Sequence, residues 1–402
     1  MKILWVNPNF LHPTTKGGQI RTLEILRHLH RWHEVHYAAL SSPDATEGPS
    51  RAGEYSARSY AFPHRVPGKR SAAFLGQLSR GLLSPVPVAV SRFYSPALAR
   101  FVVESLESGS FDRVVCDFLA AAPHFPDLGR ALLFQHNVET IIWRRHAEHA
   151  SNPMAKAYLR MQAKRMFQYE RRACRAAGDI VAVSGVDANK MREMFGVTRV
   201  HEIPTGVDLE YFRPTAPHPP VADLLFVGSM DWLPNVDGVK HFLAEILPRI
   251  RKKRPQTTFA IVGRDPSPEL KAIAARTPGV IVTGTVPDVR RYVWGARVSV
   301  VPLRIGGGTR LKIYESMAAR VPVVSTRVGA EGLEVTHPEN IRLADGPDEF
   351  AAACLELLAS EGDRIRQAES AWQLVSSRFS SEKVARRFEE ILRGAPPAGR
   401  AS

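Results

Sequence analysis

The sequence predicts an α/β protein with two doubly wound domains that face a cleft. Short apolar runs rich in valine and isoleucine, typical of strands buried on both faces, alternate with segments of helical length along the 402 residues. The alternation continues on both sides of a stretch at 214–220, whose four prolines suit a stiff linker. We therefore expect one domain at 1–217 and a second at 218–378.

The first domain is expected to begin with a strand–turn–helix–strand unit. The run 2–8 has the composition of a buried strand, 19–32 has helical spacing of its apolar residues, and 34–40 has the pattern of the next strand. Gly17 and Gly18 occupy the turn between the first strand and the helix. Paired glycines are common in such turns, so these two alone do not define a ligand site.

The rest of the first domain is regular only in part. Between 41 and 96 we expect a strand at 59–62 and a helix at 72–83. The later elements are helices at 96–107 and 185–195 and strands at 113–118, 131–135, 179–183 and 200–204. His136 directly follows one of these strands, at the end of a strand where open α/β sheets bind ligands. From the residues alone, His136 is either a ligand contact or a packing or capping histidine.

A strongly basic helical stretch follows, with a break expected near 151–153. Its segment 144–175 carries much of the formal net charge of +14. Such a charge suits an anionic partner: a nucleotide, a nucleic acid or the acidic inner leaflet of a membrane. Two interpretations stay open, a basic amphipathic helix resting on a bilayer or a long solvated helix with its apolar face buried. No nucleic-acid-binding motif is present, so we expect no nucleic acid partner.

Composition points to a cytoplasmic globular protein. No apolar run approaches the ~20 residues of a membrane span, and the first residues begin a strand rather than a signal peptide. The three cysteines, Cys116, Cys174 and Cys354, are scattered along the chain. They suggest a reducing compartment, without a disulfide framework or a metal cluster.

The second domain repeats the alternation. Its strands are expected at 224–227, 259–263, 280–285, 298–303, 321–325 and 340–343, the last of them at an edge. Gly228 and Ser229 form the turn after the first of these strands, ahead of a helix at 236–252. A final helix at 379–394 and a disordered tail at 395–402 end the chain.

The stretch 298–331 carries the clearest chemistry. A buried strand leads into a glycine-rich turn at 306–308 and then into a helix for which Thr309 is a suitable N-cap. Free N–H groups at such a helix start favour a phosphate. Lys312 and Glu315 lie on one face of the helix, so the lysine can neutralise a diphosphate and the carboxylate can accept the two hydroxyls of a ribose. The alternative is an ordinary helix start with a solvated Lys–Glu pair worth a few tenths of a kcal/mol.

These residues resemble the donor site of glycosyltransferase family 4, the group 1 glycosyl transferases, which are retaining enzymes of the GT-B fold. The family's Glu-Ala-Met-Ala helix and its following Pro-Val-Val are similar to 315–318 and 322–324. Its Pro-x-Gly-Val-Asp-x-x-x-Phe-x-Pro turn is matched at 204–214. One residue departs from the pattern: Gly307 stands where many members carry the first of two glutamates, which contacts the donor sugar.

The segment 232–235 resembles a Trp-x-Pro-Asn subgroup that lacks the arginine–lysine pair with which many members clamp the diphosphate. The positive charge must then come from Arg304, Arg310 or Lys312, of which Lys312 fits the helix geometry best. The resemblance implies that His136 faces the donor sugar and that Glu315 binds the ribose. We expect His136, Lys312 and Glu315 to be the catalytic residues. The expected donor-binding residues are Gly17, Gly18, Gly228, Ser229, Arg264, Val286, Gly307, Gly308, Thr309 and Arg310, with Val286 contacting the base through its backbone.

The resemblance implies a retaining, metal-independent hexosyltransferase that moves a sugar from a nucleotide-diphosphate sugar to a glycan or lipid-linked acceptor. Cell-surface or exopolysaccharide synthesis, at the inner face of the membrane, is the expected setting. Two Rossmann-like domains are implied, with the final helix crossing back to the first. No Asp-x-Asp motif occurs, so neither a metal nor a cofactor is expected. The alternatives are a GT-B sugar-nucleotide epimerase, a catalytically inactive sugar-nucleotide-binding protein, and a basic membrane- or nucleic-acid-binding protein.

Overall fold

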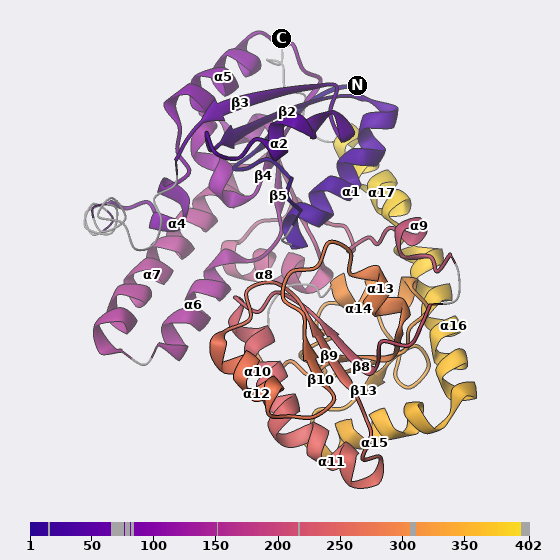
Figure 1. Cartoon of the computed structure of the whole chain (residues 1–402). Helices are drawn as coiled ribbons and strands as arrows, with labels where there is room; N and C mark the ends of the chain where they lie inside the picture. The colour runs from indigo at the N-terminus through magenta and orange to yellow at the C-terminus, as the bar shows by residue number, and fades with distance from the viewer. Residues whose placement is uncertain are drawn as a thin grey trace. The chain divides into compact units, whose positions relative to one another are not determined.

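The computed structural model of the chain describes residues 1–14, 17–65, 76, 81, 84–150, 152–215, 218–305 and 311–394 (Figure 1). The chain divides into two compact units. The first contains Met1–Pro204 together with the chain from Val384, and the second is Thr205–Lys383. The domain boundaries expected near 218 and 379 stay predictions. The tail at 395–402 and most of the helix expected at 72–83 lie outside the described residues.

The first unit is built on a seven-stranded parallel sheet with the order β3-β2-β1-β4-β5-β6-β7. The strands are β1 Lys2–Asn7, β2 Glu34–Ser41, β3 Arg58–Pro63, β4 Arg113–Asp117, β5 Leu132–Gln135, β6 Asp179–Ala182 and β7 Val200–Glu202. The order reverses between β1 and β4, and doubly wound sheets bind ligands at the carboxyl ends of the strands beside such a reversal.

Helices cover both faces of this sheet. They are α1 Gly17–Trp32, α2 Glu47–Ser50, α4 Val88–Ser91, α5 Pro96–Glu107, α6 Glu139–His149, α7 Pro153–Ala176, α8 Gly185–Phe195 and α17 Ser381–Gly394, with short 3-10 helices η1 Ala52–Glu54, η2 Leu119–His124 and η3 Leu128–Arg130. Successive residues of β1 point to opposite faces, so Ile3 and Trp5 pack in one core while Leu4 and Val6 pack in the other. Phe388 of α17 joins the first of these cores against Trp5, with ring centroids 5.3 Å apart.

The basic segment 144–175 forms a hairpin of α6 and α7, which lie side by side (Figure 1). The predicted break is confirmed: α6 ends at His149 and α7 begins at Pro153. The Asn152 side chain caps α7 by accepting hydrogen bonds from its first N–H groups. The inner face of α7, which includes Ala163 and Met166, is buried in the first unit. This packing favours a solvated helix with a buried apolar face, although it leaves the basic outer face open to a partner. None of the described helices is both long enough and apolar enough to cross a membrane.

The second unit is built on a six-stranded parallel sheet with the order β10-β9-β8-β11-β12-β13. Its strands are β8 Ala222–Val227, β9 Phe259–Val262, β10 Val280–Val282, β11 Ala296–Val301, β12 Val323–Ser325 and β13 Arg342–Leu343. Its helices are α9 Leu209–Phe212, α10 Leu233–His241, α11 Leu247–Lys253, α12 Pro268–Ala275, α13 Arg290–Trp294, α14 Leu311–Ala318, α15 Pro347–Ala359 and α16 Glu361–Arg378. The predicted fold class, two doubly wound parallel-sheet domains, is confirmed.

The helix expected at 236–252 differs from the prediction. It consists of α10, a π-helical turn at Phe242–Ile246 and α11. Pro248 lies just after the π turn and has no N–H to donate four residues back, so the widened turn accommodates it without ending the helix.

Candidate active site

Asp117, the last residue of β4, is the centre of a buried polar network at the carboxyl edge of the first sheet. Its side chain is fully buried. One carboxylate oxygen, Oδ2, accepts hydrogen bonds from Trp5 Nε1 at 2.9 Å, Asn7 Nδ2 at 2.6 Å and Thr22 Oγ1 at 2.8 Å. The other, Oδ1, lies 2.7 Å from His136 Nε2. A single carboxylate therefore ties β1, α1 and β4 to the residue that follows β5.

His136 is held between an anion and a cation. Its Nδ1 lies 3.1 Å from an Nη of Arg21, which is a donor only, so Nδ1 must accept this hydrogen bond. The ring proton is then on Nε2 and is donated to Asp117. Burial lowers the pKa of His136, opposed by Asp117 and reinforced by Arg21. Burial also lowers the pKa of Arg21, to about 10, against the charges of Asp187 and Asp117. His136 is thus a neutral imidazole with both nitrogens engaged.

Phe118 covers this network. Its ring stacks on the His136 ring, with centroids 4.0 Å apart and an interplanar angle of 15°. Gly18, near the start of α1, lies against the same two side chains. A Cβ atom at Gly18 would be 2.5 Å from Cζ of Phe118 and 3.6 Å from Nδ1 of His136. Gly18 is therefore required for close packing, whereas Gly17 is an exposed residue at the start of α1.

Two carboxyl groups lie just beyond His136. Glu170 of α7 is fully buried and accepts hydrogen bonds from the backbone N–H of Glu139, from that of Thr140 and from Thr140 Oγ1, at 2.6–2.9 Å. Glu170 thereby caps the first turn of α6. Burial raises the pKa of Glu170 to about 8 and that of Glu139 to about 7. Glu170 of α7 thus fixes the backbone that follows His136.

In the second unit, Lys312 in the first turn of α14 reaches the carboxyl end of β8. Its Nζ lies 3.0 Å from Oδ1 of Asn235 and 4.2 Å from the centre of the Phe226 ring. Asn235 is buried and donates from Nδ2 to the Ser229 carbonyl at 2.8 Å. A Cβ atom at Gly228 would be 2.6 Å from Nζ of Lys312. The lysine, the asparagine and the glycine turn after β8 therefore converge on one point.

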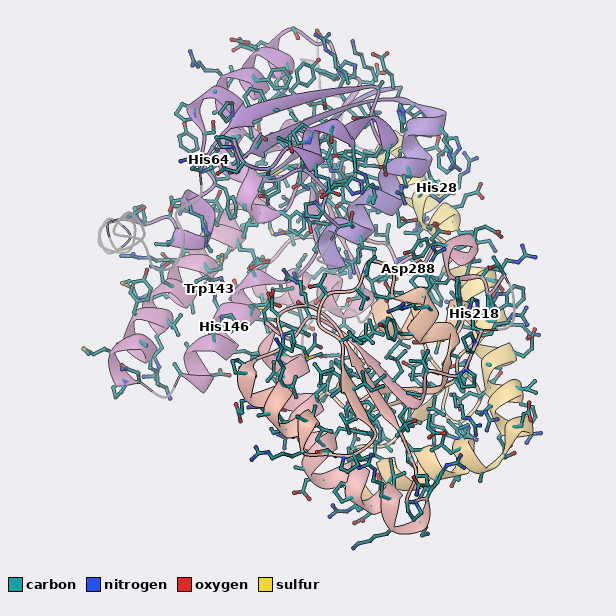
Figure 2. All side chains as sticks on the ribbon, in the orientation of Figure 1. His28, His64, Trp143, His146, His218 and Asp288 are labelled. Carbon is teal, nitrogen blue, oxygen red and sulfur yellow. The ribbon has the colours of Figure 1, made fainter. Side chains whose placement is uncertain are left out.

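Glu315 lies one turn further along α14 and is half-buried. Burial raises the pKa of its carboxyl to about 7, although Lys312 opposes this shift. Within the described parts of the chain, the Glu315 carboxylate has no hydrogen-bonded partner. Burial raises the pKa of the Tyr211 phenol in α9, and the negative charges of Asp288 and Glu315 raise it further. Glu315 is therefore close to Tyr211. Asp288, labelled in Figure 2, binds Arg290, whose guanidinium lies 4.1 Å from the centre of the Tyr211 ring.

The remaining donor-binding predictions occupy the same end of the second sheet. Arg264, after β9, donates to Ser229 Oγ at 2.7 Å and forms an ion pair with Asp231 at 2.9 Å. A Cβ atom at Gly263 would be only 1.8 Å from the carbonyl oxygen of Gly228, so a glycine at 263 lets the ends of β8 and β9 approach. Val286 is half-buried against the core of the second unit.

Arg304, an alternative source of positive charge, is bound to Asp237 through two hydrogen bonds of 2.6 and 3.0 Å. Its charge is therefore balanced by Asp237. Gly307, Gly308, Thr309 and Arg310 lie outside the described residues. In the described ranges there is no group of three or more histidine, cysteine, aspartate or glutamate side chains that could hold a metal ion.

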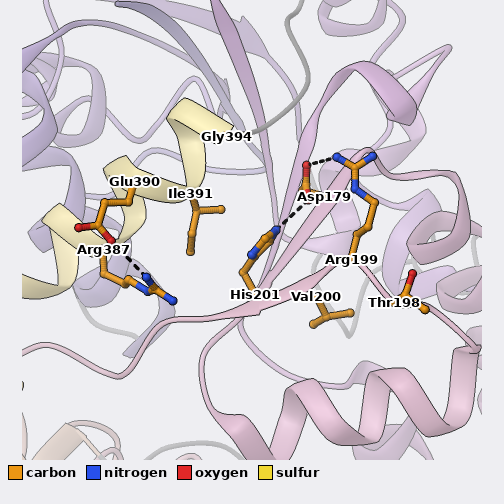
Figure 3. A pocket seen from close by; sticks show the side chains of 9 residues that line it. All are labelled: Asp179, Thr198, Arg199, Val200, His201, Arg387, Glu390, Ile391 and Gly394. Carbon is orange, nitrogen blue, oxygen red and sulfur yellow. Dashed lines mark hydrogen bonds and ion pairs between the residues drawn. The ribbon is translucent and has the colours of Figure 1, made fainter.

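A hollow of about 530 Å³ lies elsewhere in the first unit (Figure 3). Asp179, at the amino end of β6, lines it and binds Arg199 and His201, each at 2.8 Å. Arg387 and Glu390 of α17 line the facing side. The amino ends of β6 and β7 are at the edge of the sheet opposite to Asp117 and His136, so this hollow is separate from the candidate active site.

Sequence reasoning did not identify Asp117, Arg21, Phe118 or Asn235 as site residues. Asp117 offered one signal, since a carboxylate that ends a buried strand needs partners. Asn235 belongs to the Trp-x-Pro-Asn segment already noted. Arg21 gave no signal, because an arginine in an amphipathic helix is ordinarily exposed.

Solved structures share this architecture over the whole chain. Anabaena Alr3699/HepE in complex with UDP and glucose is 16% identical, with a TM-score of 0.69, and the match covers 98% of this chain and 100% of that one. Sucrose-phosphate synthase from Thermosynechococcus elongatus is 14% identical, with a TM-score of 0.73 and 98% of both chains covered. The fold is therefore that of the GT-B glycosyltransferases.

Two family models match consecutive parts of the sequence. "Glycosyltransferase Family 4" matches residues 15–211 and "Glycosyl transferases group 1" matches residues 222–360. Together they cover more than four fifths of the 402 residues. The chain belongs to the group 1 glycosyl transferases of glycosyltransferase family 4.

Curated relatives match over shorter stretches. A protein of Klebsiella pneumoniae, described as an uncharacterized 44.6 kDa protein in the cps region, is 25% identical over 169 residues, which are 40% of this chain and 44% of that protein. D-inositol 3-phosphate glycosyltransferase 2 of Catenulispora acidiphila is 28% identical over 208 residues, which are 46% and 48% of the two chains. The chain thus spans about half the length of the curated relatives it matches.

Proposed function

We propose that this protein is a retaining, metal-independent glycosyltransferase that uses a nucleotide-diphosphate sugar. The observation that carries the proposal is the pairing of Lys312 and Glu315 on successive turns of α14. Lys312 is directed toward the glycine turn after β8, and the half-buried Glu315 carboxylate has no hydrogen-bonded partner among the described residues. A diphosphate can bind the lysine while a ribose diol donates to the glutamate, so the two groups suit the two parts of one nucleotide.

In the proposed reaction, the bond between the anomeric carbon and the diphosphate breaks while a bond to the acceptor hydroxyl forms on the same face of the sugar. A β-phosphate oxygen takes the acceptor proton, and Lys312 stabilises the negative charge that develops on the leaving diphosphate. No protein base is required by this scheme. The state of His136 is compatible with that, since both of its ring nitrogens already have partners. We assign His136 a role in shaping the sugar site.

A glycan or lipid-linked acceptor is the proposed second substrate, in cell-surface or exopolysaccharide synthesis at the inner face of the membrane. The relative from a cps region supports this setting. The basic outer face of α6 and α7 supports a peripheral contact with anionic lipid. Arg144, Arg160 and Lys164 surround one shallow groove there, together with the single acidic residue Glu148.

The proposal is tested by thermal unfolding of the full chain with UDP, GDP, ADP, dTDP and CMP, each in large excess. A ligand at ~100 times its dissociation constant adds about 2.7 kcal/mol to the free energy of unfolding, which gives a readable increase in Tm. One diphosphate should stand out, and donors with that base should then release product in the presence of acceptor. No shift with any nucleotide would overturn the donor site. A shift without product from any donor would instead indicate the inactive binding protein.

Glu315 makes the binding of that diphosphate depend on pH. An ionised carboxylate accepts both ribose hydroxyls, and with a pKa of about 7 only about a tenth of Glu315 is ionised at pH 6. Affinity should therefore fall about tenfold from pH 8 to pH 6. The phosphates of the ligand also titrate in this range, so the comparison is made with Glu315→Gln, measured by calorimetry under the same conditions. A wild-type pH profile parallel to that of Glu315→Gln would contradict the role of Glu315.

A further inference from the structure

Phe118 has a backbone conformation that phenylalanine rarely adopts. Its φ of 69° and ψ of 145° fall near a region populated almost only by glycine. Asp265 and Arg320 are the other described residues, glycines apart, with positive φ. Phe118 is the bulkiest of the three and stands directly after Asp117 at the centre of the candidate active site. A strained bulky residue at such a place indicates that its side chain is needed where the strain puts it.

The surrounding backbone holds Phe118 in this conformation. Its N–H donates to the carbonyl of Phe134 at 3.0 Å, which extends the pairing of β4 with β5 by one residue. Its carbonyl accepts the N–H of Ala121 at 3.0 Å, at the start of η2. The residues before it alternate between the two faces of the sheet, but the positive φ turns the Phe118 ring out of that alternation and over His136.

The ring is only partly buried by these contacts. One of its faces is covered by the His136 imidazole and its edge is against Gly18, yet Phe118 is half-buried whereas Asp117 and His136 are at most 3% exposed. If Phe118 served only to shield the Asp117–His136 pair from water, this would explain why one face of its ring is covered. Shielding does not account for the part of Phe118 that stays accessible at the edge of the sheet where ligands bind.

We propose that Phe118 is the aromatic platform on which the sugar ring of the acceptor lies. The negative face of an aromatic ring attracts the weakly positive C–H groups on the apolar face of a pyranose. The nucleotide-binding groups, Lys312 and Glu315, belong to the second unit, so the first unit is left to bind the other substrate. Phe118 then determines acceptor affinity, and His136 supports the ring from beneath. This inference rests on the proposed function and names a residue for its acceptor site.

Saturation-transfer NMR tests the proposal with methyl glycosides of common hexoses and 2-acetamido sugars as probes. Irradiation of the aromatic protons of the wild-type protein should transfer saturation to the C–H groups on one face of at least one probe. Phe118→Ala and Phe118→Gly should abolish the transfer and weaken binding of that probe about tenfold or more. Phe118→Tyr, which keeps the ring, should retain binding within about threefold.

The alanine and glycine variants form a matched pair. Both remove the ring, but only glycine relieves the positive φ, so Phe118→Gly should have a higher Tm than Phe118→Ala although both lose the probe equally. If the loss of binding instead paralleled the decrease in Tm, Phe118 would have a purely structural role and the proposal would be overturned. A wild-type protein that binds none of the probes would also overturn it. The Tm increase with the cognate nucleoside diphosphate should persist in every variant. Its absence in the wild type would mark failure of the proposed function, which is distinguishable from failure at Phe118.

Discussion

Replacing Lys312 with alanine should reduce sugar transfer by about 10²- to 10³-fold, the loss typical when one group that stabilises developing negative charge is removed. The ammonium group is held by Asn235 at 3.0 Å and by the face of the Phe226 ring at 4.2 Å, so its position does not depend on the ligand. A charge fixed in advance needs no reorganisation when the diphosphate leaves. The loss should therefore appear in kcat, measured as nucleoside diphosphate released with the donor that the nucleotide panel identifies.

The matched control for this variant is Lys240→Ala. Lys240 is a lysine of α10 in the same unit and forms a surface ion pair with Glu269 at 2.6 Å. Its replacement should leave kcat within about twofold, because exposed pairs contribute little. In Lys312→Ala, the Tm increase caused by the diphosphate should also shrink, whereas the increase caused by the corresponding nucleoside should not. Near-normal turnover of Lys312→Ala would exclude the lysine from the transferase chemistry.

Much of the fold could be predicted because buried parallel strands have a local signature. In β1, Ile3 and Trp5 face one core while Leu4 and Val6 face the other, which requires the continuous apolar run seen in the sequence. The strand expected at 280–285 was less accurate. β10 is only Val280–Val282, at the edge of its sheet, and Ile281 is 48% exposed. The prediction extended the strand through Thr-Gly-Thr at 283–285, but Gly284 has a φ of 71°, a left-handed conformation that does not continue a strand.

The candidate site could be predicted only where it is local. Lys312 and Glu315 lie within one helix, so helical spacing was enough to place them together. The contacts that fix them are not local: Asn235 comes from α10 and Gly228 from the end of β8, and strand order alone brings these residues to α14. Arg21 is the clearest omission. The spacing of α1 suggested an apolar face through Ile20 and Leu23, but Arg21 is also turned inward, because Asp117 and His136 at the adjacent strand ends provide its partners.

Asp117→Asn should have the largest effect in the first unit. The carboxylate accepts three hydrogen bonds at Oδ2 and one at Oδ1, whereas an asparagine has one acceptor oxygen and one amide group that donates. With the amide toward His136, the ring proton must move to Nδ1, where it meets the Arg21 guanidinium 3.1 Å away. With the side chain turned the other way, the amide N–H groups face the three donors of Trp5, Asn7 and Thr22. Either orientation leaves buried donors facing one another, and we expect a loss of about 3–5 kcal/mol in the free energy of unfolding.

A second Asp–His pair in the same sheet provides the control. Asp179, also buried, lies 2.8 Å from His201 Nε2, but at the opposite end of the strands and with His201 41% exposed (Figure 3). Asp179→Asn should cost less stability, because water can replace the lost partners, and should leave the activity of the folded protein unchanged. Asp117→Asn should lower both the free energy of unfolding and the activity of the folded protein.

The tautomer of His136 separates a specific effect from general destabilisation. Nitrogen-correlated NMR should find a neutral Nε2–H ring in the wild-type protein and in Asp179→Asn. In Asp117→Asn we expect an Nδ1–H ring, because the side-chain oxygen stays with its three donors and the amide then faces His136. If Asp117→Asn kept the wild-type tautomer together with wild-type stability, Asp117 would not be the group that determines the tautomer of His136. The expected result would instead make this carboxylate, which contacts no predicted substrate, the residue that holds the proton of His136 on Nε2 beneath Phe118.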